Sequence, residues 1–376
     1  MADVASLRIV FTGSVEKLQK SLEDVTSSLF KLQGRTEKIG RALSTGLTLP
    51  LAAIGAGAAK FSIDFNRAMA NIGTLIPDNI DRLQELKSTV QDMAVATGKS
   101  TSDVAGGLYE VLSAMGDTAD TAKILEINVK TASAGLATVN ETVKFTTAVT
   151  KGYGDTTAAA TQKVADLGAK AVEIGQTTFP ELAASIGQVV PVSVALGVSQ
   201  EELFAIMGTF TGVTGDASLV TTQLRSAMNG LLDPSKELQS LYDKLGVKSG
   251  QALIQQYGLA GALQTVAKSA EASGIPLPKM LGRIEAVTLA LAISGNQADT
   301  YSTNLERMYN AAGTVDKQFR QQTDGINKLG FQFDQLKSRL MVVAQQFGDA
   351  LAPGLSNMAD GAGKLVSKLE ALVKWF

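Results

Sequence analysis

The strongest constraint on the fold is an apolar stripe that runs from residue 301 to residue 350 in alternating steps of four and three. Fourteen of its fifteen positions are apolar, and only Gln322 is polar. A repeat of 3.5 residues keeps these side chains on one side of an α-helix and is typical of a seam between supercoiled helices. We therefore predict a long heptad helix over 296–352. The members of the seam are Tyr301, Leu305, Met308, Ala312, Val315, Phe319, Gln322, Ile326, Leu329, Phe333, Leu336, Leu340, Val343, Phe347 and Ala350.

Glycine and proline residues are expected to bend and to end this long helix. Four glycines within it each cost about 1 kcal/mol in a helix interior, so we expect the rod to be bent or partly flexible. Pro353 and Gly354 end it, because proline cannot continue a helix. A C-terminal amphipathic helix is expected over 353–376, where the apolar pattern restarts one position out of phase.

A second, shorter seam lies near the N-terminus, where we predict a short strand and a coiled-coil helix over 1–46. Either seam could fold back as a hairpin within the chain, but the sustained 3.5 repeat favours pairing with partner chains. The side chains predicted to form this oligomer seam are Val15, Leu18, Leu22, Val25, Leu29, Leu32, Leu305, Met308, Val315, Phe319, Ile326, Leu329, Phe333, Leu336, Leu340, Val343 and Phe347.

The residues between the seams read as a run of short helices. Hydrophobic residues form 45% of the chain but aromatic residues only 5%, which suits helices built from Ala, Leu, Val and Ile that pack closely together. Capping residues predict helix starts at Asp78, Ser102, Ser199 and Asp233–Pro234. Glycines predict the ends, at Gly98, Gly116, Gly197 and Gly246.

The fold class that follows is all-α, with a multi-helix globular middle domain flanked by heptad coiled-coil segments. The middle domain is expected over 73–295. A weak internal repeat relates 103–116 to 181–197 if three residues of the second copy are treated as an insertion. No alternating strand pattern competes with this interpretation.

The composition excludes several common kinds of catalytic and metal-binding site. The chain has no Cys and no His, which excludes disulfides, thiolate–metal sites, cysteine nucleophiles and the commonest general base. Glu201 and Glu202 lie at a helix start, where carboxylates favour the helix dipole and need no catalytic role. We therefore predict no catalytic, cofactor-binding or metal-binding residues. A net charge of -2 provides no general attraction to nucleic acid or to anionic lipid.

The stretch over 42–59 raises two further possibilities. Its glycines do not fit a phosphate-binding loop, because Lys60 is followed by Phe61 where Ser or Thr is needed. It carries no charge over a length close to the roughly 20 residues that cross a bilayer, but its glycines, hydroxyl residues and proline oppose insertion. A small-residue helix packed against its neighbours, over 47–72, is the favoured interpretation.

Several of these stretches resemble bacteriophage tail tape measure proteins. The resemblance lies in "LSTGLTLPLAAIGAGAAKFSIDFNRAMANIGTL" (43–75), "TGKSTSDVAGGLYEVLSAMG" (97–116), and the segments over 178–211, 212–247 and 345–365, whose order makes the match fairly specific. Members of this family are usually much longer, so we expect either a short tape or an N-terminal portion.

The resemblance implies a structural protein of the tail and no enzyme. Tape measure chains lie in the lumen of the tail tube, set its length, template its assembly and leave at genome ejection. Implied partners are further copies of the chain (a trimer), tail-tube and baseplate hub proteins, tail assembly chaperones and the host inner membrane, with no specific nucleic acid and no cofactor. Implied locations are the virion, the host cytoplasm during assembly and the host envelope after ejection. The alternatives are a membrane-active ejection or pore protein that uses 42–59, and a generic coiled-coil scaffold.

Overall fold

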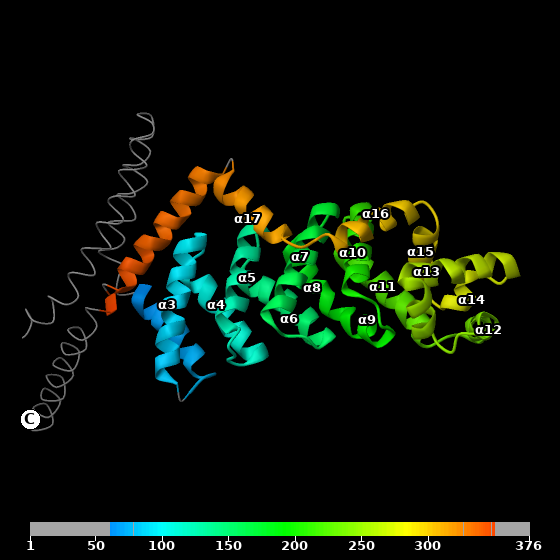
Figure 1. The fold of residues 1–376 in the computed structure, drawn as a ribbon, viewed down its shortest axis with the longest axis horizontal. Helices are drawn as coiled ribbons and strands as arrows, with labels where there is room; N and C mark the ends of the chain where they lie inside the picture. The colour runs from blue at the N-terminus through cyan, green and yellow to red at the C-terminus, as the bar shows by residue number, and fades with distance from the viewer. Residues whose placement is uncertain (1–60, 78, 326, 347, 350–376) are drawn as a thin grey trace, which may run out of the picture. The chain divides into compact units, whose positions relative to one another are not determined.

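The structure is a computed structural model that describes residues 61–77, 79–325, 327–346 and 348–349. Within these residues every regular element is a helix and none is a strand (Figure 1), which confirms the predicted all-α class. The predicted strand and coiled-coil helix over 1–46 and the predicted helix over 353–376 lie outside the described residues.

The chain divides into two compact units. Of the described residues, unit 1 contains 61–106 and 328–349, and unit 2 contains the rest of the chain between them. One helix, α4 (Thr101–Met115), contributes residues to both. The helices over 298–324 pack into unit 2.

Unit 1 is built from helical stretches that each bury one apolar stripe. These are 61–73, α3 (Ile80–Thr97), the start of α4, and 328–346. In three of these stretches large buried apolar side chains recur at steps of three or four, the period of one helix face. They include Phe65, Met69 and Ile72 in the first stretch, Leu86, Val90 and Ala94 in α3, and Leu336, Leu340 and Val343 in the last.

Unit 2 consists of the remaining helices. In chain order they are α5 (Thr121–Ala134), α6 (Val139–Tyr153), α7 (Ala158–Ile174), α8 (Phe179–Ser185), the 3-10 helix η1 (Ile186–Gln188), α9 (Val190–Leu196), α10 (Gln200–Thr214), α11 (Ala217–Leu232), α12 (Lys236–Leu245), α13 (Gly250–Ser273), α14 (Leu277–Leu281), α15 (Ile284–Ser294), α16 (Ala298–Tyr309) and α17 (Thr314–Asp324).

The path of the chain through unit 2 runs outward and then returns. On the outward path α5, α6 and α7 pack on one another, α7 packs on α10, and α10 packs on α11. The helices α12 to α14 lie at the end far from α5 (Figure 1). On the return path α15 packs on α11 and α13, α16 packs on α10, and α17 reaches α5 and α7. The last helix of the unit therefore closes against its first helices.

Local capping explains where many of these helices begin and end. Ser199 caps α10 as predicted, in a capping box with Glu202. Left-handed glycines follow the helices predicted to end at Gly98, Gly116, Gly197 and Gly246, with φ between 69° and 73°. Glycine adopts this conformation without the steric cost that other residues incur.

Three predicted starts are corrected. At α3 the cap is Asn79, which follows the predicted Asp78 and whose side chain accepts a hydrogen bond from the backbone of Arg82. At α4 it is the Ser100 hydroxyl, not Ser102, that accepts a hydrogen bond from the backbone of Asp103. At α12 the cap is Ser235, which follows the predicted Asp233–Pro234 pair. All three caps stand close to the predicted ones, and the sequence pattern alone does not choose between neighbouring capping residues.

Aromatic rings and glycines shape the centre of unit 2. Phe145 of α6 meets Phe179 edge-on at a ring-centroid distance of 5.5 Å and Phe204 of α10 at 5.6 Å. Glycines make room for such groups: a Cβ at Gly168 would lie 2.5 Å from the Phe145 ring, and a Cβ at Gly208 would lie 2.6 Å from Ile174. The expectation that helices of this chain pack closely together therefore holds in this core.

The two stretches of the weak internal repeat have different structures. The first, 103–116, lies almost entirely in the single helix α4, whereas 181–197 is divided into α8, η1 and α9. Pro191 stands at the start of α9, where it lacks the N–H that a continuous helix would use. The repeat therefore does not produce two equivalent helices.

Candidate functional site: the carboxy-terminal seam

The predicted carboxy-terminal seam is divided among three helical stretches, α16, α17 and 328–346. A single helix over 296–352 is therefore not present in the folded chain. Gly313 marks the first break, where it precedes α17 with a left-handed φ of 78°, and Gly325 follows α17 as its C-cap. Because glycine has the weakest preference for helix interiors after proline, two of the glycines expected to bend the rod interrupt it.

In unit 2 the seam residues are used by the chain's own core. Tyr301, Met308 and Val315 are buried there, with at most 5% of each residue exposed. Leu305 packs partly buried against the same core, and Phe319 is half-buried. These side chains from two separate helices therefore face inward in the folded unit.

In unit 1 the last helical stretch behaves in the same way. Leu336, Leu340 and Val343 are buried, and Phe333 is half-buried. Leu329 is 45% exposed at the start of the stretch. The remaining predicted seam residues lie outside the described residues, and pairing through them stays a prediction: Val15, Leu18, Leu22, Val25, Leu29, Leu32, Ile326 and Phe347.

A buried carboxylate from α7 caps the break before α17. Asp166 is only 3% exposed. Its Oδ2 accepts a hydrogen bond from the backbone N–H of Gly313 at 3.0 Å, and its Oδ1 accepts one from Val315 at 2.8 Å. Gln162 also donates to Oδ2, at 3.2 Å. No side chain from its own N-terminus caps α17, so a carboxylate from another helix satisfies the donors and faces the positive end of the helix dipole.

The rest of α17 is mostly polar and packs on α5 and α7. Lys130 of α5 approaches the Asp316 carboxylate at 4.0 Å, and Gln318 donates to the carbonyl of Ala169 at 3.4 Å. The large apolar side chains of α17 are Val315 and Phe319 alone. The first turn of this helix, where Asp166 binds, is one point of its attachment to unit 2.

The preceding helix, α16, is attached by buried polar groups as well as by apolar contacts. The Asn304 side chain donates to the Thr209 hydroxyl of α10 at 3.0 Å, and both residues are buried. The Tyr301 hydroxyl is buried with no hydrogen-bond partner among the described residues. Burial raises the pKa of Tyr301 far above its ordinary value, and Glu202 and Tyr309 add to the shift. This phenol therefore stays neutral.

In unit 1 a polar cluster joins Asp349 to the stretch over 61–73 and to α3. The Lys87 ammonium donates to Asp349 Oδ2 and to Asn66 Oδ1, both at 2.8 Å. Asn66 donates to Asp349 Oδ1 at 2.6 Å, and the Ser62 hydroxyl also donates to this carboxylate. Burial acts to raise the pKa of Asp349, but the hydrogen bonds and the charge of Lys87 outweigh it and lower the pKa. The cluster fixes the register of these segments.

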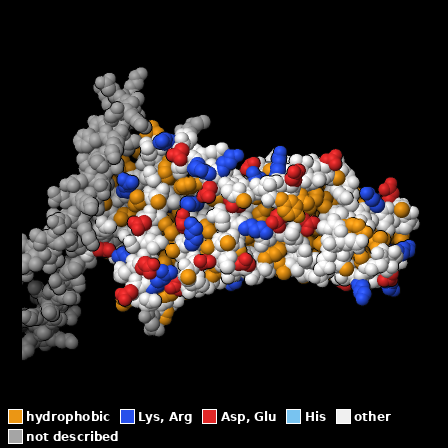
Figure 2. Space-filling view, viewed as in Figure 1, with side chains coloured by type: hydrophobic (Ala, Val, Ile, Leu, Met, Phe, Trp, Pro, Cys, Tyr) orange, Lys and Arg blue, Asp and Glu red, His pale blue; other side chains and the backbone are white. Residues whose placement is uncertain are grey.

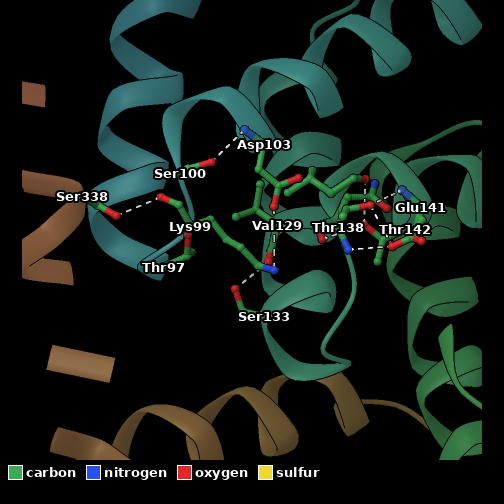
Figure 3. A network of polar contacts seen from close by, with 12 residues as sticks. Thr97, Lys99, Ser100, Asp103, Val129, Ser133, Thr138, Glu141, Thr142 and Ser338 are labelled. Carbon is green, nitrogen blue, oxygen red and sulfur yellow. Dashed lines mark hydrogen bonds and ion pairs between the residues drawn. The ribbon is translucent and has the colours of Figure 1, made fainter. Parts of the chain in front are cut away.

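Further polar contacts in unit 1 hold the last helical stretch to the turn between α3 and α4. The Ser338 hydroxyl donates to the carbonyl of Lys99 at 2.9 Å, next to the Ser100–Asp103 cap (Figure 3). The Gln345 side chain donates to the Thr101 hydroxyl at 2.6 Å. The seam residues of this stretch are therefore accompanied by specific polar contacts within the chain.

The two glutamates at the start of α10 have structural contacts. Glu201 forms an ion pair with Lys163 at 2.8 Å. Glu202 completes the α10 capping box, and its Oε1 also accepts from the backbone of Leu259 at 2.8 Å. That contact stabilises the kink in α13 at Gly258, which has φ 71° and ψ 171°. The interpretation of these carboxylates as helix-start residues therefore agrees with their contacts.

Sequence patterns did not identify Asp166 or the Lys87–Asp349 cluster as important. The one available signal for Asp166 is its position inside an apolar stretch, between Ala165 and Leu167. A charge in such a place predicts a buried partner, because an unpaired buried carboxylate is costly. The identity of that partner could not be predicted, since it stands 147 positions away at Gly313.

The described part of the chain contains no cluster of three or more carboxylates, His or Cys suited to a metal ion. On the face of unit 2 drawn in Figure 2, basic and acidic side chains are interspersed. No single described helix is long and apolar enough to cross a membrane, although 179–188 and 190–196 together reach that length across a 54° bend. The stretch over 42–59, for which a membrane span was considered, lies outside the described residues.

Comparison of the sequence with known proteins identifies relatives of this chain. Residues 87–269 match the family described as phage-related minor tail protein. The chain is 26% identical over 400 residues to the probable tape measure protein of Clostridium phage phiCD119, a match that covers 94% of this chain and 42% of the relative. It is 23% identical over 250 residues to the tape measure protein of Pneumococcus phage Dp-1, with 63% of this chain and 21% of the relative covered. The chain thus spans less than half the length of either relative, and no solved structure matches it.

Proposed function

We propose that this chain, which carries a domain of the phage-related minor tail protein family and is related to bacteriophage tail tape measure proteins, is a structural component of a phage tail that sets tail length. The observation that carries the proposal is the similarity to a probable tape measure protein along 94% of the chain. An all-α chain with a heptad seam is compatible with this role.

The proposed mechanism is physical and requires no catalysis. A helix advances about 1.5 Å per residue, so each heptad adds roughly 10.5 Å to an extended rod. Tail-tube subunits assemble around the rod until its length is used, and the chain leaves the tube at genome ejection. Length then depends on how many residues lie in the rod and how they are extended, and no individual side chain performs a reaction.

The same proposal includes partners and a location. The chain acts as a homo-oligomer, a trimer, whose copies pair through the seam residues. It contacts tail-tube and baseplate hub proteins, tail assembly chaperones before assembly, and the host inner membrane at ejection. It resides in the lumen of the tail tube in the virion. The interspersed surface charges of unit 2 are compatible with contacts to proteins and do not form a continuous basic surface on the face shown (Figure 2).

An insertion series in a phage that carries this chain tests the length-setting role. The boundary between Asn327 and Lys328 separates the two compact units, so an insertion there divides neither core. Insertions of two, four and six whole heptads with Leu at the seam positions should lengthen a helical rod by about 21, 42 and 63 Å. Electron micrographs should show tails that lengthen in steps of whole tube rings.

Matched insertions of the same lengths, with Ser at the seam positions, serve as the control. They add the same number of residues without an apolar stripe. The comparison therefore distinguishes an effect of chain length from an effect of pairing between helices. Tails of unchanged length throughout both series would contradict the proposal and favour a generic coiled-coil scaffold, for which heptad number has no bearing on tail length.

A further inference from the structure

The heptad spacing of the seam continues across the break between α16 and α17, although the two helices are separate in the folded chain. Met308 in α16 and Val315 in α17 are seven residues apart, one heptad, and Ala312 keeps the four-three spacing between them. The two helices have different main neighbours, α10 for α16 and α5 for α17, and both also contact α7. Ala312 lies exposed inside the break. Packing within unit 2 therefore explains why each helix has an apolar face. It does not explain why the apolar positions of both helices follow one continuous heptad repeat.

Asp166 stabilises the broken form specifically. In a continuous α-helix the N–H of residue i donates to the carbonyl of residue i−4. The N–H groups of Gly313 and Val315 would then donate to the carbonyls of Tyr309 and Ala311. In this structure both groups donate to the Asp166 carboxylate instead, at 3.0 and 2.8 Å. The carboxylate thus competes directly with the hydrogen bonds of a helix that runs through the break.

Gly313 favours the broken form for a second reason. Its φ of 78° is accessible to glycine and strained for other residues. No atom lies within 4 Å of the position that a Cβ would take there. Replacement by Ala therefore introduces no steric collision, but it disfavours the left-handed turn and favours a helical one, both in the direction of a continuous helix.

We propose that the α16–Asp166–α17 arrangement is a latch that stores the seam inside the chain, and that its release lets 301–324 form one helix that pairs with further copies of this chain. The two states exclude each other, because Tyr301, Met308 and Val315 cannot be buried in their own core and against another copy at once. The inference extends the seam pairing of the proposed function but does not depend on the length-setting role. The latch would prevent premature association of free chains.

The test uses the full chain with Asp166→Asn and Gly313→Ala combined. The native chain has no Cys, so one introduced thiol reports one position. Ala312→Cys places it on the seam, and Lys317→Cys places it on an exposed position outside the seam. Copies paired in parallel bring equivalent seam positions together, whereas thiols outside the seam remain apart. Disulfide-linked dimers after mild oxidation and sedimentation over a concentration series measure the pairing.

The expected result is about a tenfold or greater rise in Ala312→Cys dimers in the latch variant relative to the native background, since left-handed strain alone changes an equilibrium by roughly that factor. Lys317→Cys should show no such rise. The matched control is Gly274→Ala, which places the same strain at another left-handed helix end with no atom near the new Cβ. It should not increase seam dimers.

Three outcomes would overturn the latch. The latch variant could remain monomeric without seam-specific dimers, or Gly274→Ala could produce as many dimers, or circular dichroism could show that the variant loses helix and associates through both thiol positions equally. If the latch variant forms no seam dimers but tails still lengthen with heptad insertions, the latch is refuted and the length-setting role is not. Unresponsive tails with intact seam dimers would instead remove the length-setting role.

Discussion

A close contact between a helix glycine and an aromatic ring in unit 2 makes a strong test of its packing. A Cβ at Gly168 in α7 would lie 2.5 Å from Cζ of Phe145 and 3.2 Å from a ring carbon of Phe179. Phe145 is fully buried and contacts Phe179 and Phe204 at ring-centroid distances of 5.5 and 5.6 Å. The ring is rigid and has packed neighbours, so Gly168→Ala requires a shift of the surrounding core.

The size of the effect follows from two opposing terms. Overpacking of a well-packed core costs about 1–3 kcal/mol. Replacement of a mid-helix glycine by Ala returns about 1 kcal/mol of helix propensity. Because the new contact falls well below an ordinary van der Waals distance and meets a rigid ring, we place the cost at the upper end. Gly168→Ala should therefore destabilise the chain by about 1–2 kcal/mol.

Urea denaturation followed by circular dichroism measures this change, with Gly106→Ala as the matched control. Gly106 lies in α4 with no atom within 4 Å of the position that a Cβ would take, so the same substitution should stabilise by up to about 1 kcal/mol. In a Phe145→Leu background, Gly168→Ala should cost less stability than it does in the native chain, because the colliding ring atoms are removed. A stability gain for Gly168→Ala equal to that of Gly106→Ala would refute the close packing of α7 on this ring.

Three further predictions concern single side chains. The Asp349 carboxyl has a pKa in the folded chain below its unfolded value of about 3.9. Its contribution to stability is therefore present above that pH and is lost as the pH falls through the folded pKa. In thermal melts, the loss of melting temperature caused by Asp349→Asn should therefore shrink below about pH 4. Tyr301→Phe should be neutral or stabilise by about 1 kcal/mol in urea unfolding, because it removes a buried hydroxyl that has no partner among the described residues; a loss above about 2 kcal/mol would show that the hydroxyl is satisfied. Leu136 has a left-handed φ of 52° and is 82% exposed, so Leu136→Gly should stabilise by about 0.5 kcal/mol and Leu136→Ala should not, as differential scanning calorimetry can show.

Local signals predicted most of the helical architecture. Ser199 caps α10 because its hydroxyl reaches a donor only three residues away, and Gly197 and Gly246 end helices because only glycine adopts their φ without strain. Such interactions involve neighbours in sequence and leave a pattern that can be read without the fold. Their position remains less certain than their existence, as Ser100 and Ser235 illustrate.

The candidate site was predicted only in part. The periodicity identified Tyr301, Met308 and Val315 as residues that face an apolar partner, and they are buried. It did not reveal that the partner in the folded chain is the chain itself. A heptad stripe reports which helix face avoids water and contains no information about which surface covers it.

The sequence by itself determined that this protein is helical, where many of its helices are capped, and which side of each carboxy-terminal helix is apolar. Tertiary structure decided where the seam is interrupted and what holds the interruption. Asp166 binds Gly313 and Val315 across 147 and 149 positions of sequence. The physical reason is that capping and periodicity depend on neighbours within a few residues, whereas the competition between a continuous helix and a broken one depends on a buried charge that only folding brings to the break.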